Sequence, residues 1–167
     1  MKRGEKSARI TDEAGEATPA KEPKVGKRLL VVDDDASVRE MLGRVLTGEG
    51  YKVWSAGSGA EALALAARER IDLALLDLNL PGQSGWDTFE RLTGEHPHLG
   101  VIIITARSNQ LFTALGAGVG ALLEKPLDFP TLLETVKRLL AEPVEVRLAR
   151  LAGRPGDFYH NSSQPKR

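Results

Sequence analysis

The chain has 167 residues, of which 41% are hydrophobic and 28% are charged, and it contains no cysteine. This length suits one domain with a sizeable core, and the absence of cysteine excludes disulfides and thiolate metal sites. No apolar run approaches the ~20 residues of a membrane span, and the first residues resemble no signal sequence. We therefore expect a cytoplasmic protein with no membrane partner.

The formal net charge is zero, but the charge is unevenly distributed, because residues 29–142 carry 16 acidic and ten basic side chains. Residues 1–27 are rich in Lys, Glu, Gly, Ala and Pro and almost lack large apolar side chains. Such a segment buries too little apolar surface to offset the entropy lost on ordering. We expect a flexible tail over residues 1–27, followed by a folded domain over residues 28–142.

Short apolar runs alternate with helical patterns from Arg28 onward. The apolar runs occupy residues 28–33, 51–56, 71–78, 101–105 and 121–125. The helical patterns occupy residues 37–50, 58–70, 84–93, 110–116 and 128–142. Alternation of this kind is typical of a parallel sheet with helical crossovers, and unbroken runs such as LLVV and VIII indicate strands buried on both faces. The sequence predicts an α/β fold, a doubly wound (βα)5 sheet.

Polar side chains stand where several of these strands end. The first strand ends at Asp33 and Asp34, the third at Asp77, the fourth at Thr105 and the fifth at Lys125. In doubly wound sheets, ligands bind at the carboxyl ends of the strands. We therefore expect these side chains to meet at one edge of the sheet.

The residue types in this group indicate phosphoryl transfer. Crowded carboxylates repel one another unless a cation lies among them, and oxygen ligands of this kind suit Mg²⁺. An aspartate can act as a nucleophile toward phosphorus, and a lysine and a threonine can orient and neutralise the transferred group. The aspartates are therefore predicted to hold Mg²⁺.

The combined pattern closely resembles the receiver domain of two-component response regulators. Its elements are Asp33-Asp34, Asp77 within LLDLNLPGQSGWD, Thr105-Ala106 and Lys125-Pro126. The resemblance extends over about residues 28–141. It implies a flavodoxin-like, five-stranded sheet of order 2-1-3-4-5.

The resemblance also implies roles for individual residues. Asp77 would accept the phosphoryl group, while Asp33 and Asp34 would form the Mg²⁺ pocket with Asp77 and with the backbone carbonyl of Asn79. Thr105 would bind the phosphoryl oxygens.

Lys125 would bind these oxygens too, and together with the threonine it would couple them to a conformational change. The donor would be a sensor histidine kinase or a phosphotransfer protein, and the output would be a phosphorylation-dependent contact with a downstream protein that the sequence does not identify. On this interpretation the chain is a signalling phosphoacceptor and not an enzyme, since it catalyses only its own phosphorylation and dephosphorylation.

The sequence departs from the receiver pattern in two places. Receivers commonly have an aromatic residue three positions before the lysine, where this chain has Leu122. About two residues are also missing between Thr105 and Lys125, within the segment ARSNQLFT. We expect the conformational change to lie mainly in this segment, with a smaller contribution from Leu122.

Two other functions are weighed against this one. The stretch DDDAS also fits haloacid-dehalogenase phosphohydrolases, with Asp33 as nucleophile and Asp35 as acid. Those enzymes need a later strand that ends in an acidic pair, and this alternative leaves Asp77 without a role. Asp35 is better explained as a helix N-cap or a solvated acid than as a ligand. The other alternative is a pseudo-receiver, an interaction module that is not phosphorylated.

The final 25 residues, 143–167, are too few for a DNA-binding domain, which needs on the order of 50 residues. We expect a stand-alone receiver with a C-terminal tail that forms a short helix and is then disordered. In VEVRLARL, Val144, Leu148 and Leu151 would line one side of such a helix, with Arg147 and Arg150 on another. The helix would dock on a partner or on the domain, or, as we prefer, simply extend the last helix after a proline break.

Overall fold

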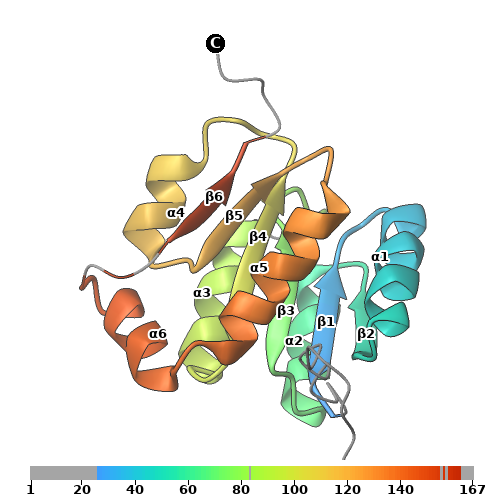
Figure 1. The fold of residues 1–167 in the computed structure, drawn as a ribbon, viewed down its shortest axis with the longest axis horizontal. Coiled ribbons are helices and arrows are strands. Elements are labelled where there is room, and N and C mark those ends of the chain that lie inside the picture. The colour runs from blue at the N-terminus through green and yellow to red at the C-terminus, as the bar shows by residue number, and fades with distance from the viewer. Residues whose placement is uncertain (1–25, 83, 155, 157, 163–167) are drawn as a thin grey trace, which may run out of the picture.

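The computed structural model describes residues 26–162 except 83, 155 and 157. A six-stranded parallel sheet of order β2-β1-β3-β4-β5-β6 forms its centre (Figure 1). The strands are β1 (Arg28–Val32), β2 (Lys52–Ala56), β3 (Leu73–Asp77), β4 (Gly100–Thr105), β5 (Ala121–Glu124) and β6 (Tyr159–Asn161). The predicted fold class and the order of the first five strands are confirmed. Almost all of the tail expected at residues 1–27 lies outside the described residues.

Helices cover both faces of this sheet. They are α1 (Ala36–Gly48), α2 (Gly59–Arg68), α3 (Gly85–Glu95), α4 (Leu111–Ala117), α5 (Phe129–Ala141) and α6 (Val144–Leu151). Successive strand residues point to opposite faces, so each central strand contributes to two cores. Leu30 and Leu76 belong to the core beneath α2, α3 and α4, while Leu29 and Leu75 belong to the core beneath α1 and α5. Double burial explains why the strand sequences are apolar throughout.

Short polar side chains begin most of these helices. The Asp35 carboxylate accepts a hydrogen bond from the Ser37 N–H at 2.8 Å, which confirms its predicted role as the N-cap of α1. Ser58, Ser84 and Asp128 cap α2, α3 and α5 in the same way. Each cap satisfies a free backbone N–H and fixes the point at which the chain turns from a strand end into a helix.

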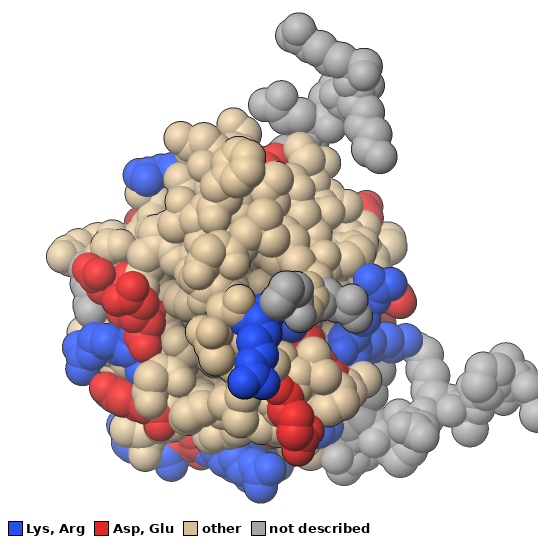
Figure 2. Space-filling model, turned by 90° about the vertical axis from the view of Figure 1, so that its left-hand side faces the viewer, with Lys and Arg blue, Asp and Glu red and all other residues tan. Residues whose placement is uncertain are grey.

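Helix α4 is short and uncharged. Its seven residues contain no ionisable side chain, and Phe112 and Leu115 are 85% and 48% exposed. Figure 2 faces the side of the molecule that carries α4 and α6, and its upper part is almost free of Lys, Arg, Asp and Glu. An uncharged surface with exposed apolar side chains is typical of a protein contact site.

The sixth strand was not predicted from the sequence. Residues 159–161, which we expected to lie in a disordered tail, run parallel to β5, with Leu122 beside His160. A segment of three residues with two polar side chains has no recognisable strand pattern of its own. The neighbouring edge of β5 supplies its hydrogen bonds, and Tyr159 adds a partly buried side chain to the core.

Helix α6 contacts the domain through its charged side. Arg147 and Arg150 are only 6% and 7% exposed, whereas Val144 and Leu148 are each 42% exposed. The guanidinium groups satisfy backbone carbonyls at the ends of other elements, among them those of Leu139 and Gly118. The apolar positions of α6 that we had considered for docking therefore largely face outward. No helix in the described part of the chain is long and apolar enough to cross a membrane.

Candidate functional site

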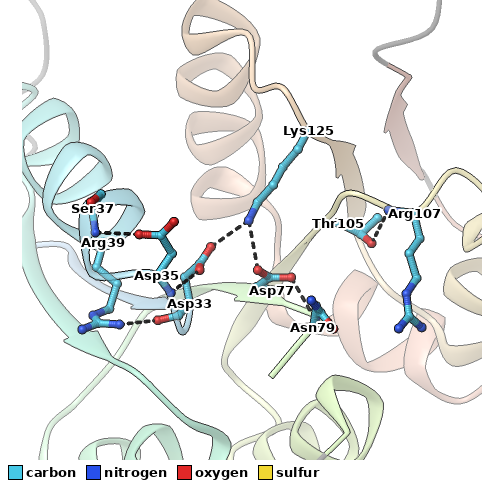
Figure 3. Close-up of polar contacts among 9 residues, drawn as sticks. All are labelled: Asp33, Asp35, Ser37, Arg39, Asp77, Asn79, Thr105, Arg107 and Lys125. Carbon is cyan, nitrogen blue, oxygen red and sulfur yellow. Dashed lines mark hydrogen bonds and ion pairs between the residues drawn. The ribbon is translucent and has the colours of Figure 1, made fainter. Parts of the chain in front are cut away.

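The strand ends bring three charged side chains together at the carboxyl edge of the sheet. Lys125 Nζ lies 2.9 Å from Asp33 Oδ2 and 3.0 Å from Asp77 Oδ2 (Figure 3). Asp33 and Asp77 are 3% and 4% exposed, and the lysine reaches them from the end of β5 across the top of β4. These residues are separated by 92 and 48 positions in the sequence, and the parallel sheet alone makes them neighbours.

Carboxylate oxygens of Asp33, Asp34 and Asp77 all lie within 4.8 Å of one another. Of these residues only Asp34 is exposed. Three carboxylates grouped in this way form a hard oxygen donor set, which is the type that binds Mg²⁺ together with water. The residues therefore fit the predicted metal ion.

Asp33 is held by backbone contacts on both sides of its turn. Its carboxylate accepts a hydrogen bond from the Asp35 N–H at 2.9 Å, and its own N–H donates to the Ala56 carbonyl. Arg39 of α1 donates from Nη1 to the Asp33 carbonyl at 2.6 Å (Figure 3). Sequence reasoning missed Arg39, whose only signal is its place in the helix directly after the aspartates.

Asp77 lies at the end of β3 and accepts a hydrogen bond from the Asn79 N–H at 2.9 Å. Burial raises the pKa of the Asp77 carboxyl, and Asp33 adds to this effect, although Asn79 and Lys125 act in the opposite direction. Burial by itself lowers the pKa of Lys125, but its hydrogen bonds and charge interactions with Asp33 and Asp77 outweigh this and raise that pKa. One ammonium group thus faces more negative charge than it neutralises.

Thr105 completes this edge from the end of β4. It is 1% exposed, and its Oγ1 accepts a hydrogen bond from the Arg107 N–H at 3.0 Å. Its backbone carbonyl accepts a hydrogen bond from the Lys125 N–H at 2.8 Å. The ends of β4 and β5 are therefore tied together directly beside the carboxylates.

The loop after Asp77 is positioned by close packing against α3. A Cβ atom added to Gly85 would lie 2.4 Å from the Cα of Leu78, so only glycine fits there. The same glycine donates its N–H to the Leu78 carbonyl at 3.3 Å. This contact fixes the loop that carries Asn79 at the mouth of the pocket.

Comparison with known proteins identifies a domain over nearly the same residues as the folded domain that the sequence predicts. Residues 29–137 match the model of the response regulator receiver domain. The chain is 33% identical over 118 residues to sporulation initiation phosphotransferase F of Bacillus subtilis, covering 70% of this chain and 95% of that protein. It is 37% identical over 116 residues to the transcriptional regulatory protein GlrR of Escherichia coli, covering 68% of this chain but 26% of that protein. The chain thus spans only about a quarter of this longer relative.

Solved structures show the same similarity. A CheY-like receiver domain protein from Methanospirillum hungatei aligns with a TM-score of 0.66 and 34% identity, covering 68% of this chain and 93% of that one. The response regulator TrrA from Thermotoga maritima, solved in complex with Mg²⁺ and BeF, aligns with a TM-score of 0.64 and 34% identity. That alignment covers 68% of this chain and 98% of the other.

Proposed function

This chain belongs to the response regulator receiver family, and from that premise we propose that Asp77 accepts a phosphoryl group from a sensor histidine kinase or a phosphotransfer protein. The observation that carries the proposal is the pair of contacts from Lys125 to Asp77 and Asp33, beside Asp34. The buried Asp77 carboxylate, the Lys125 ammonium group and the carboxylate cluster thus lie together, and the exposed Asp34 makes the group accessible to solvent.

The chemistry follows from the charges in the pocket. A carboxylate oxygen of Asp77 forms a bond to phosphorus as the bond between phosphorus and the donor nitrogen breaks, and the electron pair stays on the imidazole, which takes up a proton. A Mg²⁺ ion held by Asp33, Asp34, Asp77 and the carbonyl of Asn79 would neutralise charge on the transferred group.

The Lys125 ammonium acts both before and after the transfer in this proposal. It favours the ionised, nucleophilic form of Asp77 before transfer, against the effect of burial. Afterwards it binds a phosphoryl oxygen, as does the hydroxyl of Thr105. Because the backbones of these two residues are hydrogen-bonded to each other, their movement toward the phosphoryl group changes the ends of β4 and β5 together.

The output is a contact with a downstream protein, made in the cytoplasm. The uncharged surface over α4 supports this proposal, since it suits an apolar protein partner and begins just after the loop that follows Thr105. The protein would act as a phosphoacceptor in signalling, catalysing only its own phosphorylation and dephosphorylation.

Incubation with a small phosphodonor, with and without Mg²⁺, tests the proposal by intact mass. Wild type should gain one phosphate only with Mg²⁺, and Asp77→Asn should gain none. Asp35→Asn is the matched control, because asparagine also caps a helix and Asp35 lies beside the pocket. Phosphate found on Asp33 would favour the phosphohydrolase alternative, and no phosphate at all would favour a pseudo-receiver.

A further inference from the structure

The outer edge of β5 is covered by the chain's own C-terminal strand. In β6, Tyr159, His160 and Asn161 pair in parallel with Ala121, Leu122 and Leu123 of β5 (Figure 1). Leu122, which occupies the position where receivers commonly have an aromatic residue, is 0% exposed beneath this cover. The strand that ends at Lys125 thus carries an additional strand on its outer edge.

The two parts of this C-terminal segment are held with different strength. Arg150 of α6 binds both carboxylate oxygens of Glu142 at 2.8 Å in partly buried contacts and donates to the Gly118 carbonyl at 3.1 Å in a buried one. In contrast β6 has three residues, all half-buried. Gly153 has a φ of +82°, which allows the chain to turn between the two parts. Helix α6 is the fixed end of the segment, and β6 is the weaker end.

Side chains of β6 and of the residue that follows it converge on one buried carboxylate. His160 Nε2 lies 3.3 Å from Glu124 Oε1, and Ser162 Oγ donates to Glu124 Oε2 at 2.9 Å. Glu124 is 5% exposed and belongs to β5 itself. Both oxygens of this carboxylate are therefore engaged by the C-terminal segment.

Glu124 also lies between the two residues that are proposed to bind the phosphoryl group. Lys125 follows it directly in the chain, and Thr105 is its register partner on β4. The 2.8 Å hydrogen bond from the Lys125 N–H to the Thr105 carbonyl joins the two around it. A backbone shift of either residue toward a phosphoryl group would therefore also act on Glu124.

We propose that β6 is a reporter strand whose pairing with β5 is coupled through Glu124 to the state of Asp77, and that the β5 edge is a docking site for an extended segment of the downstream protein. This inference rests on the proposed function. Both carboxylate oxygens of Glu124 already have partners in the C-terminal segment, so displacement of Glu124 weakens these contacts. Phosphorylation therefore loosens β6 and exposes backbone groups of β5, to which an extended peptide can add as a strand.

The bound strand indicates what such a peptide contains. Phe158 packs against the core on the α4 side and Tyr159 against the core on the α5 side, while Arg138 lies over the Tyr159 ring at 5.0 Å. Two positions that donate hydrogen bonds to Glu124 follow. The matching partner segment is extended, with adjacent aromatic residues followed by a histidine or hydroxyl side chain.

Hydrogen exchange with and without Mg²⁺ and beryllofluoride, a phosphoryl mimic, tests the coupling. The amides of residues 159–161 should exchange at least about fivefold faster with the mimic, the lower end of typical coupling between sites. A response in the loop after Thr105 without any change in β6 would overturn the reporter strand alone. Absence of any response in the full chain would overturn the proposed function as well.

A double substitution, His160→Ala with Ser162→Ala, tests the same link from the other end. Removal of the contacts to Glu124 should speed exchange in β6 without the mimic. Because coupling is reciprocal, the removal should also tighten beryllofluoride binding, by the factor by which the mimic speeds exchange of β6 in the wild type. Glu145→Gln in the exposed first turn of α6 is the control. Unchanged affinity in the double variant would show that Glu124 does not link the two sites.

The docking site has its own test. A labelled synthetic peptide with the sequence of residues 156–163 should bind the full chain at least about fivefold more tightly when Mg²⁺ and beryllofluoride are present, and more weakly to Glu124→Ala. Equal binding with and without the mimic, or no binding in either state, would overturn the docking site at the β5 edge.

Discussion

Two clusters of buried charge stand at different ends of the molecule. At the carboxyl edge of the sheet, Lys125 contacts Asp33 and Asp77, and negative charge is in excess. At α6, two arginines enclose Glu142, and positive charge is in excess. Both clusters look like buried ion pairs, but their remaining hydrogen-bonding groups are satisfied differently.

The arginine cluster directs most of its spare donors to backbone carbonyls, and only the Nε of Arg147 is buried without a hydrogen-bond partner among the described residues of this cluster. Arg147 donates to the carbonyls of His98 and Leu139, and Arg150 donates to that of Gly118. Burial lowers the pKa of Arg147, and Arg150 adds to this effect while Glu142 opposes it. The aspartate cluster instead keeps several carboxylate oxygens facing one another at a partly exposed site. Excess charge on groups that are hydrogen-bonded within the chain indicates a structural role. Excess negative charge on carboxylates grouped at a partly exposed site indicates a cation-binding site.

The largest expected effect comes from breaking the structural cluster. Arg150→Leu leaves the buried Glu142 carboxylate with a weaker partner and the Gly118 carbonyl without its donor, so the free energy of unfolding should fall by about 3–5 kcal/mol. Urea denaturation measures this fall. Arg154→Leu, at an exposed position, should change it by less than about 0.5 kcal/mol. A similar small change for both variants would mean that the cluster contributes no stability.

The aspartate cluster should respond to Mg²⁺. Mg²⁺ at a hundred times its dissociation constant should stabilise the protein by about 2.7 kcal/mol, because only the folded chain groups the three carboxylates. Thermal unfolding with and without Mg²⁺, in buffer that contains no Ca²⁺, measures this gain in stability. Asp33→Asn should lose most of it and Asp35→Asn should keep it. A gain that persists in Asp33→Asn would place the ion elsewhere.

A smaller effect should appear in the dependence of stability on pH. The folded pKa of Asp77 lies above the ordinary value of 3.8, so ionisation of this group destabilises the folded state, and the cost disappears as pH falls below the folded pKa. Asp77→Asn removes the charge, so its stability relative to wild type should increase as pH rises from about 4 to 7. Denaturation across this range, without Mg²⁺, tests the sign, and a constant difference would contradict it.

The smallest effect on stability is expected at Thr105. Thr105→Val keeps the side-chain shape and leaves the Arg107 N–H without its acceptor, at a cost of about 1 kcal/mol. Phosphorylation of Asp77 should continue, while the change in hydrogen exchange after β4 should largely disappear.

Lys125→Ala should likewise permit some phosphorylation and weaken the response. A normal response in either variant would show that the residue does not couple the phosphoryl group to the loop.

Most of the site could be predicted because it depends on strand ends. An apolar run that stops at Asp33, Asp77, Thr105 or Lys125 marks the point where a parallel strand leaves the core, and such strands end at one edge. Arg39 could not be found in this way, since its contact is to a backbone carbonyl and any side chain on that turn of α1 fits the helical pattern equally well. The predicted roles of Leu122 and of the shortened loop remain predictions.

The sequence by itself determined the parallel sheet, its first five strands and the residues at its carboxyl edge, because these follow from local periodicity and from the geometry of right-handed crossovers. Only the tertiary structure decided the placement of α6 and β6. The pattern of VEVRLARL suggested an apolar contact, yet Arg147 and Arg150 donate hydrogen bonds to backbone carbonyls at the ends of α5 and α4. Strand β6 likewise forms by pairing with β5, where His160 contacts Glu124 from 36 positions away in the sequence, and no local pattern indicates a contact at such a separation.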